Sequence, residues 1–506
     1  MSRPKNLIAS LGAKALVFGL AFATLAAAIL TLPDQKLMEF DQPFYVTMAY
    51  DLDRHRTLSN GIFVDIDSTV AKPRPGMFFG PVYPVSVLAA MKIDSRFAEA
   101  VWCAVEADRQ HRDEDTCEPY ARPVRILHAL LLALGVLAIA SAGQHLFASR
   151  AVFWLSGVLA TAALAVEAPT FAFVMTESLT FFLYSIFALA LVQAWMSGHT
   201  RYYMLAGGVL GVLCLTRLSF VAVFPLAVAL SVVCAYTRKR PDRIGILAMT
   251  AVFACILLAW SARNLVSVGK FGLSEEYGAA VLIERFAYND MSAREFFLAF
   301  PFCTPGLGEL AFDTVYGTDS MHRFVYFTPG SFFHVGRDRR DQLVAEHGRL
   351  DPLIGDIVRE EMRSNWWRHL LVSLPLGWCG MWAGWVISLL LLPLFIWACR
   401  RAIGEGRLLF LLYAAPPVAM LALHGLIANH YTRYNLILIG PYAVGAAWIL
   451  ANLLAHLRPN CPTGIEHARA HCPQLSVLSP CFGHTTMPCV RRQAGEIIRV
   501  AQWIPS

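Results

Sequence analysis

Long apolar runs separated by short polar connections dominate the chain. Several of these runs reach the roughly 20 residues that a helix needs to cross a bilayer. The pattern predicts an all-α multi-pass membrane protein whose spans lie near residues 15–32, 123–147, 151–173, 177–196, 203–217, 218–236, 244–260, 376–399, 408–427 and 434–456. The first run follows a basic start that has no small-residue cleavage site, so we expect a retained span and not a signal peptide.

Positively charged residues set the expected orientation of these spans. The most basic short connections are 236–243 and 399–407, and the same side then receives Lys5, Lys14, Arg150 and Arg201. Both termini are therefore predicted to be cytoplasmic. A shorter apolar stretch with two prolines, 76–91, would put the basic connections on alternating sides if it crossed. It is predicted to lie as a helix against the outer leaflet.

Two long segments, about 33–122 and 261–375, then face the outside. Connections of this length are usually functional. The second segment ends in 351–375, where apolar residues at helical spacing predict an amphipathic helix that docks at the membrane interface. In the first segment, Cys103 and Cys117 either pair in an oxidising compartment or remain unpaired.

Composition narrows the class of protein. Of the 506 residues, 57% are hydrophobic and 15% are charged, whereas a soluble protein carries about 25% charged residues. The net charge of +6 is spread over the membrane edges and forms no single patch, which argues against a nucleic-acid partner. The sequence shows no P-loop and no internal repeat, so neither an ATP-driven pump nor an inverted-repeat transporter is indicated.

The C-terminal residues differ in character from the rest. Residues 1–456 are predicted to form one transmembrane domain, and 457–506 a cytoplasmic tail rich in cysteine and histidine. The tail has no C-x-x-C pair, so a loosely structured segment is favoured over a zinc site. No other metal site is indicated, and dependence on a divalent metal stays open.

Ionisable residues from separate parts of the chain come to the outer face on this topology. They are Asp41, Glu177, Arg217, Arg263, His430 and Arg433. Charges at span ends are also expected as interface anchors, so the alternative to a functional site is a set of anchoring residues. Asp41 opens a short amphipathic stretch, where it either caps a helix with Pro43 in the first turn or serves as a general base.

Motifs at these positions resemble the GT-C superfamily of polyprenyl-phosphate-dependent glycosyltransferases, which includes aminoarabinose transferases and protein O-mannosyltransferases. The motifs follow in order over about residues 15–456: D-x-x-x-Y-x-x-x-A from Asp41, GPVYPVSVLAAM (80–91), MTES (175–178), LTR (215–217), WSARN (260–264) and RYNLILIGP (433–441). Two residues depart from the pattern. Gln42 stands where a second acid is usual, and Leu218 replaces a proline.

This resemblance implies an enzyme of a cell membrane, such as the bacterial inner membrane, that moves a hexose or pentose from a lipid-phosphate carrier to an acceptor on the extracytoplasmic face. It implies Asp41 as the general base, with Asp51 as an alternative, and Glu177 as a residue that orients the acceptor or the base. Guanidinium groups match phosphate oxygens well. The residues implied to bind the donor phosphate are Lys72 (with Arg74 competing for this role), Arg217, Arg263, Asn264, His430, Arg433 and Tyr434.

Two other functions are compatible with the sequence. A transporter or flippase of a lipid-linked substrate needs charges near the membrane midplane, yet the centres of 123–147, 177–196 and 434–456 carry none. A catalytically inactive scaffold of the same fold remains an alternative because Gln42 and Leu218 depart from the family's pattern. The donor sugar and the acceptor are not indicated by the sequence.

Overall fold

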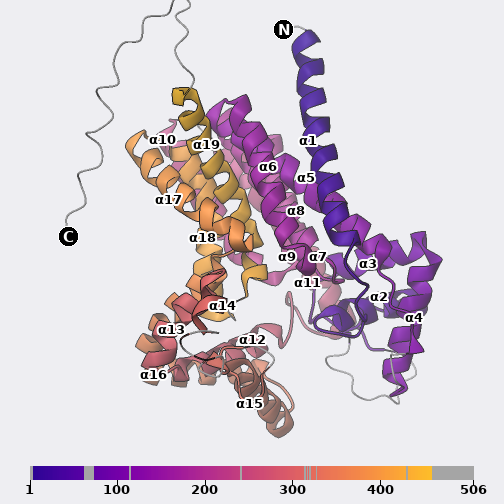
Figure 1. Ribbon diagram of the computed structural model, residues 1–506. Helices are drawn as coiled ribbons and strands as arrows, with labels where there is room; N and C mark the ends of the chain where they lie inside the picture. Colours follow the sequence, from indigo (N-terminus) through magenta and orange to yellow (C-terminus); the bar gives the residue numbers. More distant parts are fainter. Residues whose placement is uncertain are drawn as a thin grey trace, which may run out of the picture. The chain divides into compact units, whose positions relative to one another are not determined.

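The structure, a computed structural model, describes residues 4–61, 73–112, 116–239, 242–312, 315, 317, 321–325, 328–428 and 431–457. The chain divides into two units, Met1–Ala455 and His456–Ser506, and nearly all of the second lies outside the described residues. The predicted tail 457–506 therefore stays a prediction. Within the described ranges the secondary structure is helical, with no strand, which confirms the all-α fold class (Figure 1).

Long helices occupy all the places expected for spans. They are α1 (Pro4–Leu30), α5 (Arg122–Phe147), α6 (Arg150–Val166), α8 (Glu177–Ser197), α9 (Thr200–Thr216), η2 with α10 (Leu218–Ala222 and Val223–Thr237), α11 (Arg243–Val268), α17 (Ser388–Gly404), α18 (Leu408–Ile427) and η7 with α19 (Thr432–Leu438 and Ile439–Leu457). Eight helices of the described chain are long and apolar enough to cross a membrane. The other two, α6 and α9, have 17 residues each, at the short end of the range for a span.

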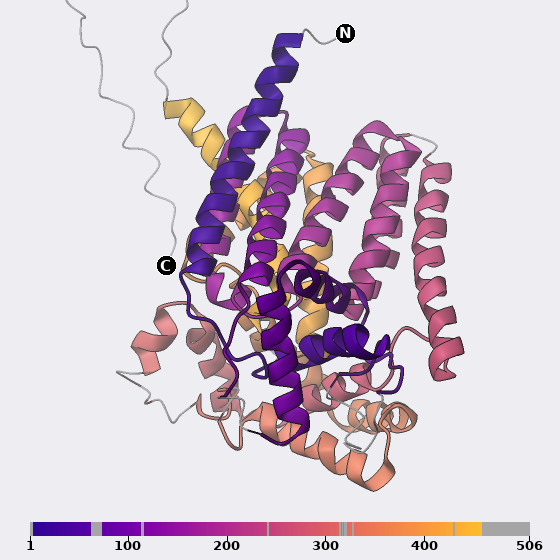
Figure 2. The ribbon, with the colours of Figure 1, turned by 90° about the vertical axis from the view of Figure 1, so that its right-hand side faces the viewer.

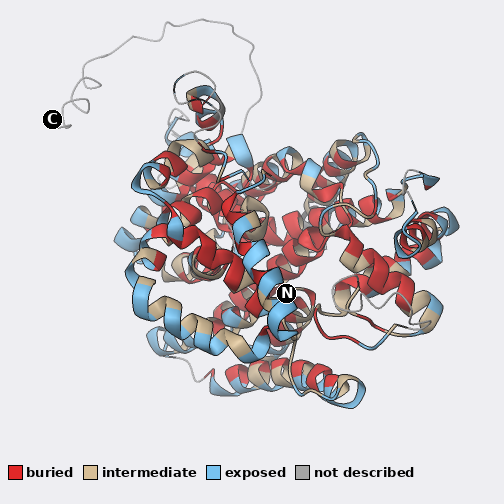
Figure 3. Cartoon of the chain, turned by 90° about the horizontal axis from the view of Figure 1, so that it is seen from below, coloured by how far each residue is buried: buried red, intermediate tan, exposed pale blue. Residues whose placement is uncertain are grey.

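Glycines let α9 pack closely against α11 in this bundle. A side-chain carbon on Gly207 would meet the Met249 carbonyl oxygen at 2.3 Å, and one on Gly245 would meet the ring of Tyr203 at the same distance. Small residues at such crossings allow helices to approach in a membrane. Buried residues fill the space between the helices and exposed residues lie on their outer sides (Figure 3).

The two long segments between spans fold into helices of their own. The first contains α2 (Gln42–His55), α3 (Val82–Ile93) and α4 (Ser95–Arg109), and α3 packs against both of the others. The second contains α12 (Tyr277–Phe286), η3 (Ala287–Asp290), α13 (Ala293–Cys303), α14 (Leu307–Ala311), α15 (Phe332–His347) and α16 (Asp351–Gly380). Both groups of helices gather at the same end of the bundle (Figures 1 and 2).

Two expected boundaries differ in the structure. The span expected at 151–173 stops at Val166, and Glu167 separates α6 from the short helix α7 (Ala168–Phe171). The span expected at 376–399 begins later, because α16 continues to Gly380 with Pro375 inside it. The chain turns at Gly384, whose φ of 93° favours glycine. The Gly384 amide donates a hydrogen bond of 2.9 Å to Glu167 Oε1. This hydrogen bond joins the residue that follows α6 to the turn that follows α16.

Two disulfides lie in the two long segments between spans, which we call the first and second outer segments after the side predicted for them. Cys103 of α4 is joined to Cys117, which resolves the alternative that the sequence left open. The second disulfide joins Cys303, the last residue of α13, to Cys379 near the end of α16 and was not predicted. The described cysteines of the spans, Cys214, Cys234, Cys255 and Cys399, are free thiols.

One buried arginine, Arg285 of α12, ties the second outer segment to the bundle. Its guanidinium donates to the Gly425 carbonyl of α18 at 3.0 Å and, in α16, to the Ser373 hydroxyl at 2.9 Å and the His369 carbonyl at 3.3 Å. Burial lowers the pKa of Arg285 to about 10, so it remains charged at neutral pH.

We expect Arg285→Met to destabilise the protein by about 3 kcal/mol, because the buried guanidinium is the donor to the Gly425 carbonyl and the Ser373 hydroxyl. The midpoint of thermal unfolding of the purified protein measures this loss. Arg294→Met is the matched control, since Arg294 is exposed on α13. Equal midpoints for the two variants would show that Arg285 does not hold the segment in place.

Candidate active site

A cavity of about 570 Å³ lies where the outer helices meet the ends of the spans. Its walls come from the start of α2, residues 78–80, the starts of α8 and η7, the end of α9, and helices α11, α12 and α15. Five residues of the predicted site line it: Asp41, Glu177, Arg217, Arg433 and Tyr434. The cavity therefore brings together most of the residues that the sequence selected.

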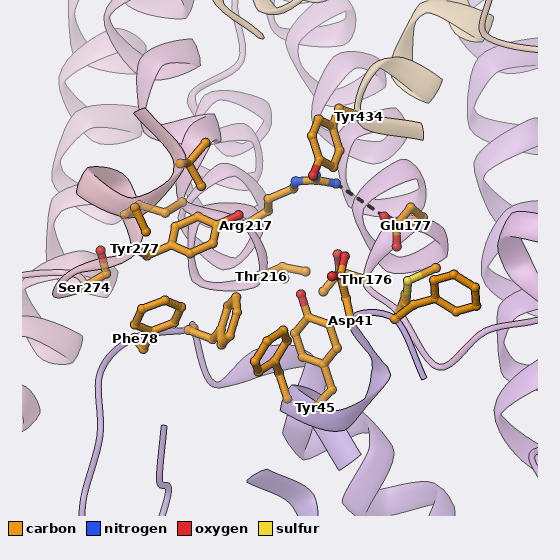
Figure 4. A pocket seen from close by; sticks show the side chains of 18 of the residues that line it. Asp41, Tyr45, Phe78, Thr176, Glu177, Thr216, Arg217, Ser274, Tyr277 and Tyr434 are labelled. Atoms are coloured by element: carbon orange, nitrogen blue, oxygen red, sulfur yellow. Dashed lines mark ion pairs between the residues drawn. The ribbon is translucent and has the colours of Figure 1, made fainter. Parts of the chain in front are cut away.

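The charged residues of this cavity form a connected cluster. Arg433 donates to Asp41, with 2.5 Å between Nη2 and Oδ2. Glu177 Oε1 lies 3.9 Å from Arg433 Nη1 and 3.8 Å from Arg217 Nη1. Figure 4 shows the pair formed by Arg217 and Glu177, with Asp41 below it in that view. We call these four residues the acid–arginine cluster.

Local structure explains how each charge reaches the cavity. Asp41 is the residue before α2, but its side chain makes no capping hydrogen bond and turns to Arg433. Glu177 is the first residue of α8, and Arg217 follows the last residue of α9 in an extended conformation. Arg433 lies in the 3₁₀ turn η7. Each is thus held at the end of a helix, where side chains face out of the bundle core.

Unused hydrogen-bonding capacity remains in the cluster. Glu177 Oε2 and Arg433 Nε are buried and have no hydrogen-bond partner among the described residues. A buried polar atom without a partner is costly, and such atoms in native structures often mark places where a ligand or water binds. The side chain of Asp41, by contrast, is 43% exposed and is accessible from the cavity.

Aromatic rings cover the arginines and line the cavity. The Arg217 guanidinium lies 4.3 Å from the centre of the Tyr434 ring, and Arg433 lies 5.3 Å from it. Tyr45, one turn after Asp41, lines the cavity (Figure 4). Burial raises the pKa of Tyr45 well above its ordinary value, so its hydroxyl stays protonated and can donate a hydrogen bond.

Two other predicted residues lie outside the cavity wall. Arg263 donates to the carbonyls of Gly76 at 2.6 Å and Leu58 at 3.2 Å, and the Asn264 amide donates to the Gly272 carbonyl at 2.8 Å. These bonds hold the loops around α11. The structure does not bring Arg263 and Asn264 into the acid–arginine cluster.

The remaining predicted positions are separate from the cluster or outside the described residues. Lys72 and His430 lie outside the described residues. Arg74, which competed with Lys72, is exposed and does not line the cavity. Asp51, the alternative base, is fully buried and accepts hydrogen bonds from Ser59 and Arg109, both at 2.6 Å. Among the described residues of the first outer segment, Asp41 is therefore the carboxylate that lines the cavity.

Sequence reasoning missed a second polar part of the cavity wall, which α12 and α15 supply. Glu284 lines it from α12, and His334, Arg337 and Arg340 line it from α15. The spacing of these residues on each helix is helical, but many solvated surface helices show the same spacing. Only the packing of α12 against α15 reveals that both faces point into one cavity.

Gln42, which replaces the usual second acid, has a positioning role. Its Nε2 donates to the Lys36 carbonyl at 2.8 Å and the Glu39 carbonyl at 3.3 Å, while its Oε1 accepts from the Val174 amide at 2.8 Å. The side chain is 1% exposed. Gln42 therefore links the start of α2, beside Asp41, to the segment just before Glu177.

We expect Gln42→Glu to lower the free energy of unfolding by about 2 kcal/mol, because a carboxylate cannot donate to the two carbonyls that the amide serves. Thermal unfolding of the purified variant measures the change. Gln35→Glu makes the same substitution in the same loop, where the side chain is half-buried and makes an exposed hydrogen bond to the Pro33 carbonyl. A loss no larger than that of Gln35→Glu would mean that this link contributes little.

In the described part of the chain, no group of three or more His, Cys, Asp or Glu side chains is placed to hold a metal ion. The cavity presents a carboxylate beside arginines. Such a site can take up a proton and can bind a phosphate group.

Comparisons with known proteins gave matches among solved structures. No protein-family model and no curated protein matches the sequence. The structure of ArnT from Cupriavidus metallidurans bound to undecaprenyl phosphate matches at 15% identity with a TM-score of 0.36, covering 88% of this chain and 80% of that one. The structure of the same protein in the apo state matches at 16% identity with a TM-score of 0.37, covering 86% and 78%.

Proposed function

We propose that the protein transfers a sugar from a polyprenyl-phosphate carrier to an acceptor on the extracytoplasmic side of the membrane. The observation that carries this proposal is the acid–arginine cluster in a cavity at the ends of the spans. A lipid carrier places its phosphate at this level, because its chain lies in the hydrocarbon and its head group in the interface. The arginines there would neutralise the phosphate.

The cluster suits the chemistry of this transfer. The hydroxyl or amine of the acceptor attacks the anomeric carbon, the bond from that carbon to the phosphate oxygen breaks, and the carrier phosphate leaves with the bonding electrons. Asp41 takes the acceptor proton as general base. Arg433 and Arg217 stabilise the charge that develops on the phosphate, since guanidinium groups remain cationic and bind phosphate oxygens in pairs.

Glu177 acts through the arginines in this scheme. Its side chain is 5% exposed and lies within 4 Å of both guanidinium groups. A buried carboxylate between two arginines reduces their mutual repulsion and orients them toward the cavity. Glu177 is therefore proposed to position the phosphate-binding groups, and through them the donor.

An extracytoplasmic location of the site is supported by the disulfides. One lies in each outer segment, at Cys103–Cys117 and Cys303–Cys379. Disulfides persist in oxidising compartments and are rare in the cytosol. The cavity is built from helices of these same segments, so it would face the same compartment.

The test uses the purified protein in nanodiscs with a small panel of polyprenyl-phosphate sugars. Binding of a donor and release of free polyprenyl phosphate on turnover would support the proposal. Binding followed by movement of an intact donor between leaflets, without release, would indicate the flippase. Binding without release of polyprenyl phosphate and without movement of the donor would indicate an inactive scaffold. If no donor bound, the proposal would be overturned.

A further inference from the structure

The cavity has a second charged end that the proposed reaction does not use. On α12, Tyr277, Ala280, Val281 and Glu284 face it, and on α15 the facing residues are Phe333, His334, Arg337 and Arg340. Both sets recur every three or four residues, so each helix presents one continuous stripe to the cavity. We call the part formed by Glu284, His334, Arg337 and Arg340 the α12–α15 end.

The two helices are held close together at this end. A side-chain carbon on Gly336 of α15 would lie 2.6 Å from the Cα of Glu284, so only glycine permits this approach. Arg340 donates to Glu284 Oε1 at 2.6 Å and to Asp341 Oδ1 at 2.6 Å. The Glu284 carboxylate and the Arg340 guanidinium thus hold each other in place. The α12–α15 end has a fixed arrangement of charges and not a set of loose surface side chains.

Arg337 differs from Arg340 in having no such partner. Among the residues that the structure describes, no ion pair or hydrogen bond engages its guanidinium, and its side chain is exposed where it lines the cavity. Glu284 does not offset this charge fully, because it is already paired with Arg340 and because burial raises its pKa to about 7. The α12–α15 end therefore carries a positive charge that is available to a ligand.

This end is separate from the acid–arginine cluster. Tyr277 lies beside Arg217 of the cluster in the cavity wall (Figure 4). Glu284 follows seven residues later on the same helix, which corresponds to about 10 Å at a rise of 1.5 Å per residue. Ala280 and Val281 line the cavity between Tyr277 and Glu284, and aromatic rings line it on the side of Tyr277, with Phe79 5.3 Å from Tyr277 and 5.5 Å from Tyr45 between ring centres. The cavity can therefore hold two polar groups at once, one at each end.

We infer that the α12–α15 end is the acceptor subsite and that it takes an acceptor bearing an acidic group, held by Arg337. The inference rests on the proposed function, since the acid–arginine cluster is assigned to the donor phosphate. The apolar and aromatic surface between the two ends accommodates the sugar and brings the acceptor's hydroxyl or amine toward Asp41. Arg340 and His334 flank the acidic group, and Glu284 accepts a hydrogen bond from a neighbouring hydroxyl.

The experiment uses the full chain in nanodiscs of phosphatidylcholine and measures binding by native mass spectrometry. Undecaprenyl phosphate is added to saturation, and dioleoyl phosphatidic acid is then titrated as an anionic acceptor surrogate, with dioleoylglycerol as the neutral comparison. We expect the parent protein to bind both anionic lipids simultaneously. Arg337→Ala should weaken binding of phosphatidic acid about tenfold and leave binding of undecaprenyl phosphate unchanged. Arg433→Ala should weaken binding of undecaprenyl phosphate and leave binding of phosphatidic acid unchanged.

Arg339→Ala is the matched control, because Arg339 is exposed on α15 and does not line the cavity. Arg337→Lys, which keeps the charge, should restore part of the affinity. Three results would overturn the acceptor subsite. The Arg337→Ala and Arg339→Ala proteins could bind phosphatidic acid equally well, or the parent protein could bind dioleoylglycerol as well as it binds phosphatidic acid. Phosphatidic acid could also displace undecaprenyl phosphate from the parent protein. Other results would contradict the proposed function and not the subsite alone. In that case undecaprenyl phosphate would not bind, or Arg433→Ala would leave its binding unchanged.

Discussion

Asp41→Asn is expected to lower turnover of a polyprenyl-phosphate sugar by about 10²–10⁴-fold, the usual contribution of a general base. Asparagine has nearly the same shape but cannot take up the acceptor proton. Donor binding should persist, because the Asp41 carboxylate contacts Arg433 and is not itself expected to contact the phosphate. The affinity should stay equal or increase, since Arg433 no longer has a competing anion.

Release of polyprenyl phosphate and equilibrium binding of the donor, measured on the same nanodisc preparation, separate these two effects. Glu39→Gln is the matched control. It neutralises an acid two residues earlier in the same loop, and Glu39 does not line the cavity. If Asp41→Asn and Glu39→Gln turned over the donor equally well, Asp41 would not be the base.

The sequence predicted the spans and much of the cluster because both depend on local features. An apolar run of about 20 residues specifies a membrane helix whatever surrounds it. Glu177, Arg217 and Arg433 stand at span ends, and Asp41 stands just before α2 in the connection that follows the first span, so their common side follows from the orientation of the spans alone.

Arg263 shows where this reasoning stops. It also stands near a span end, and Trp260, one turn earlier on α11, does line the cavity. The Arg263 guanidinium nevertheless points to the Gly76 and Leu58 carbonyls. The end of a helix is predictable from sequence, but the side of the helix that faces a cavity depends on which loop packs beside it.

The α12–α15 end and the disulfide Cys303–Cys379 were beyond prediction for a related reason. The two cysteines are 76 residues apart, and nothing local to either indicates the other. Glu284 and Arg340 are likewise far apart in the chain and meet because Gly336 lets α15 approach α12. Contacts of this kind arise from packing between outer helices, which the hydrophobic pattern of the spans does not encode.

Arg433→Ala is expected to weaken donor binding by about 100-fold or more, since truncating one partner of a buried charge pair costs about 2–5 kcal/mol. Arg433 contacts both carboxylates of the cluster, Asp41 at 2.5 Å and Glu177 at 3.9 Å. Its removal takes away a phosphate ligand and also leaves Glu177 with Arg217 as its remaining charged neighbour in the cluster. The two losses act in the same direction on an anionic donor.

Arg433→Lys separates charge from geometry in this prediction. Lysine retains the positive charge but lacks the planar fork that contacts two oxygens at once, so an intermediate affinity is expected. Titration of undecaprenyl phosphate into nanodiscs holding each variant gives the affinities, with Arg339→Ala as the control and thermal unfolding as the check on folding. Retention of parental affinity by a folded Arg433→Ala protein would assign the phosphate to other groups and would leave the arginine as an interface anchor. A graded loss from arginine to lysine to alanine would instead require direct contact between this guanidinium and the carrier phosphate, which only a ligand bound within the acid–arginine cluster can make.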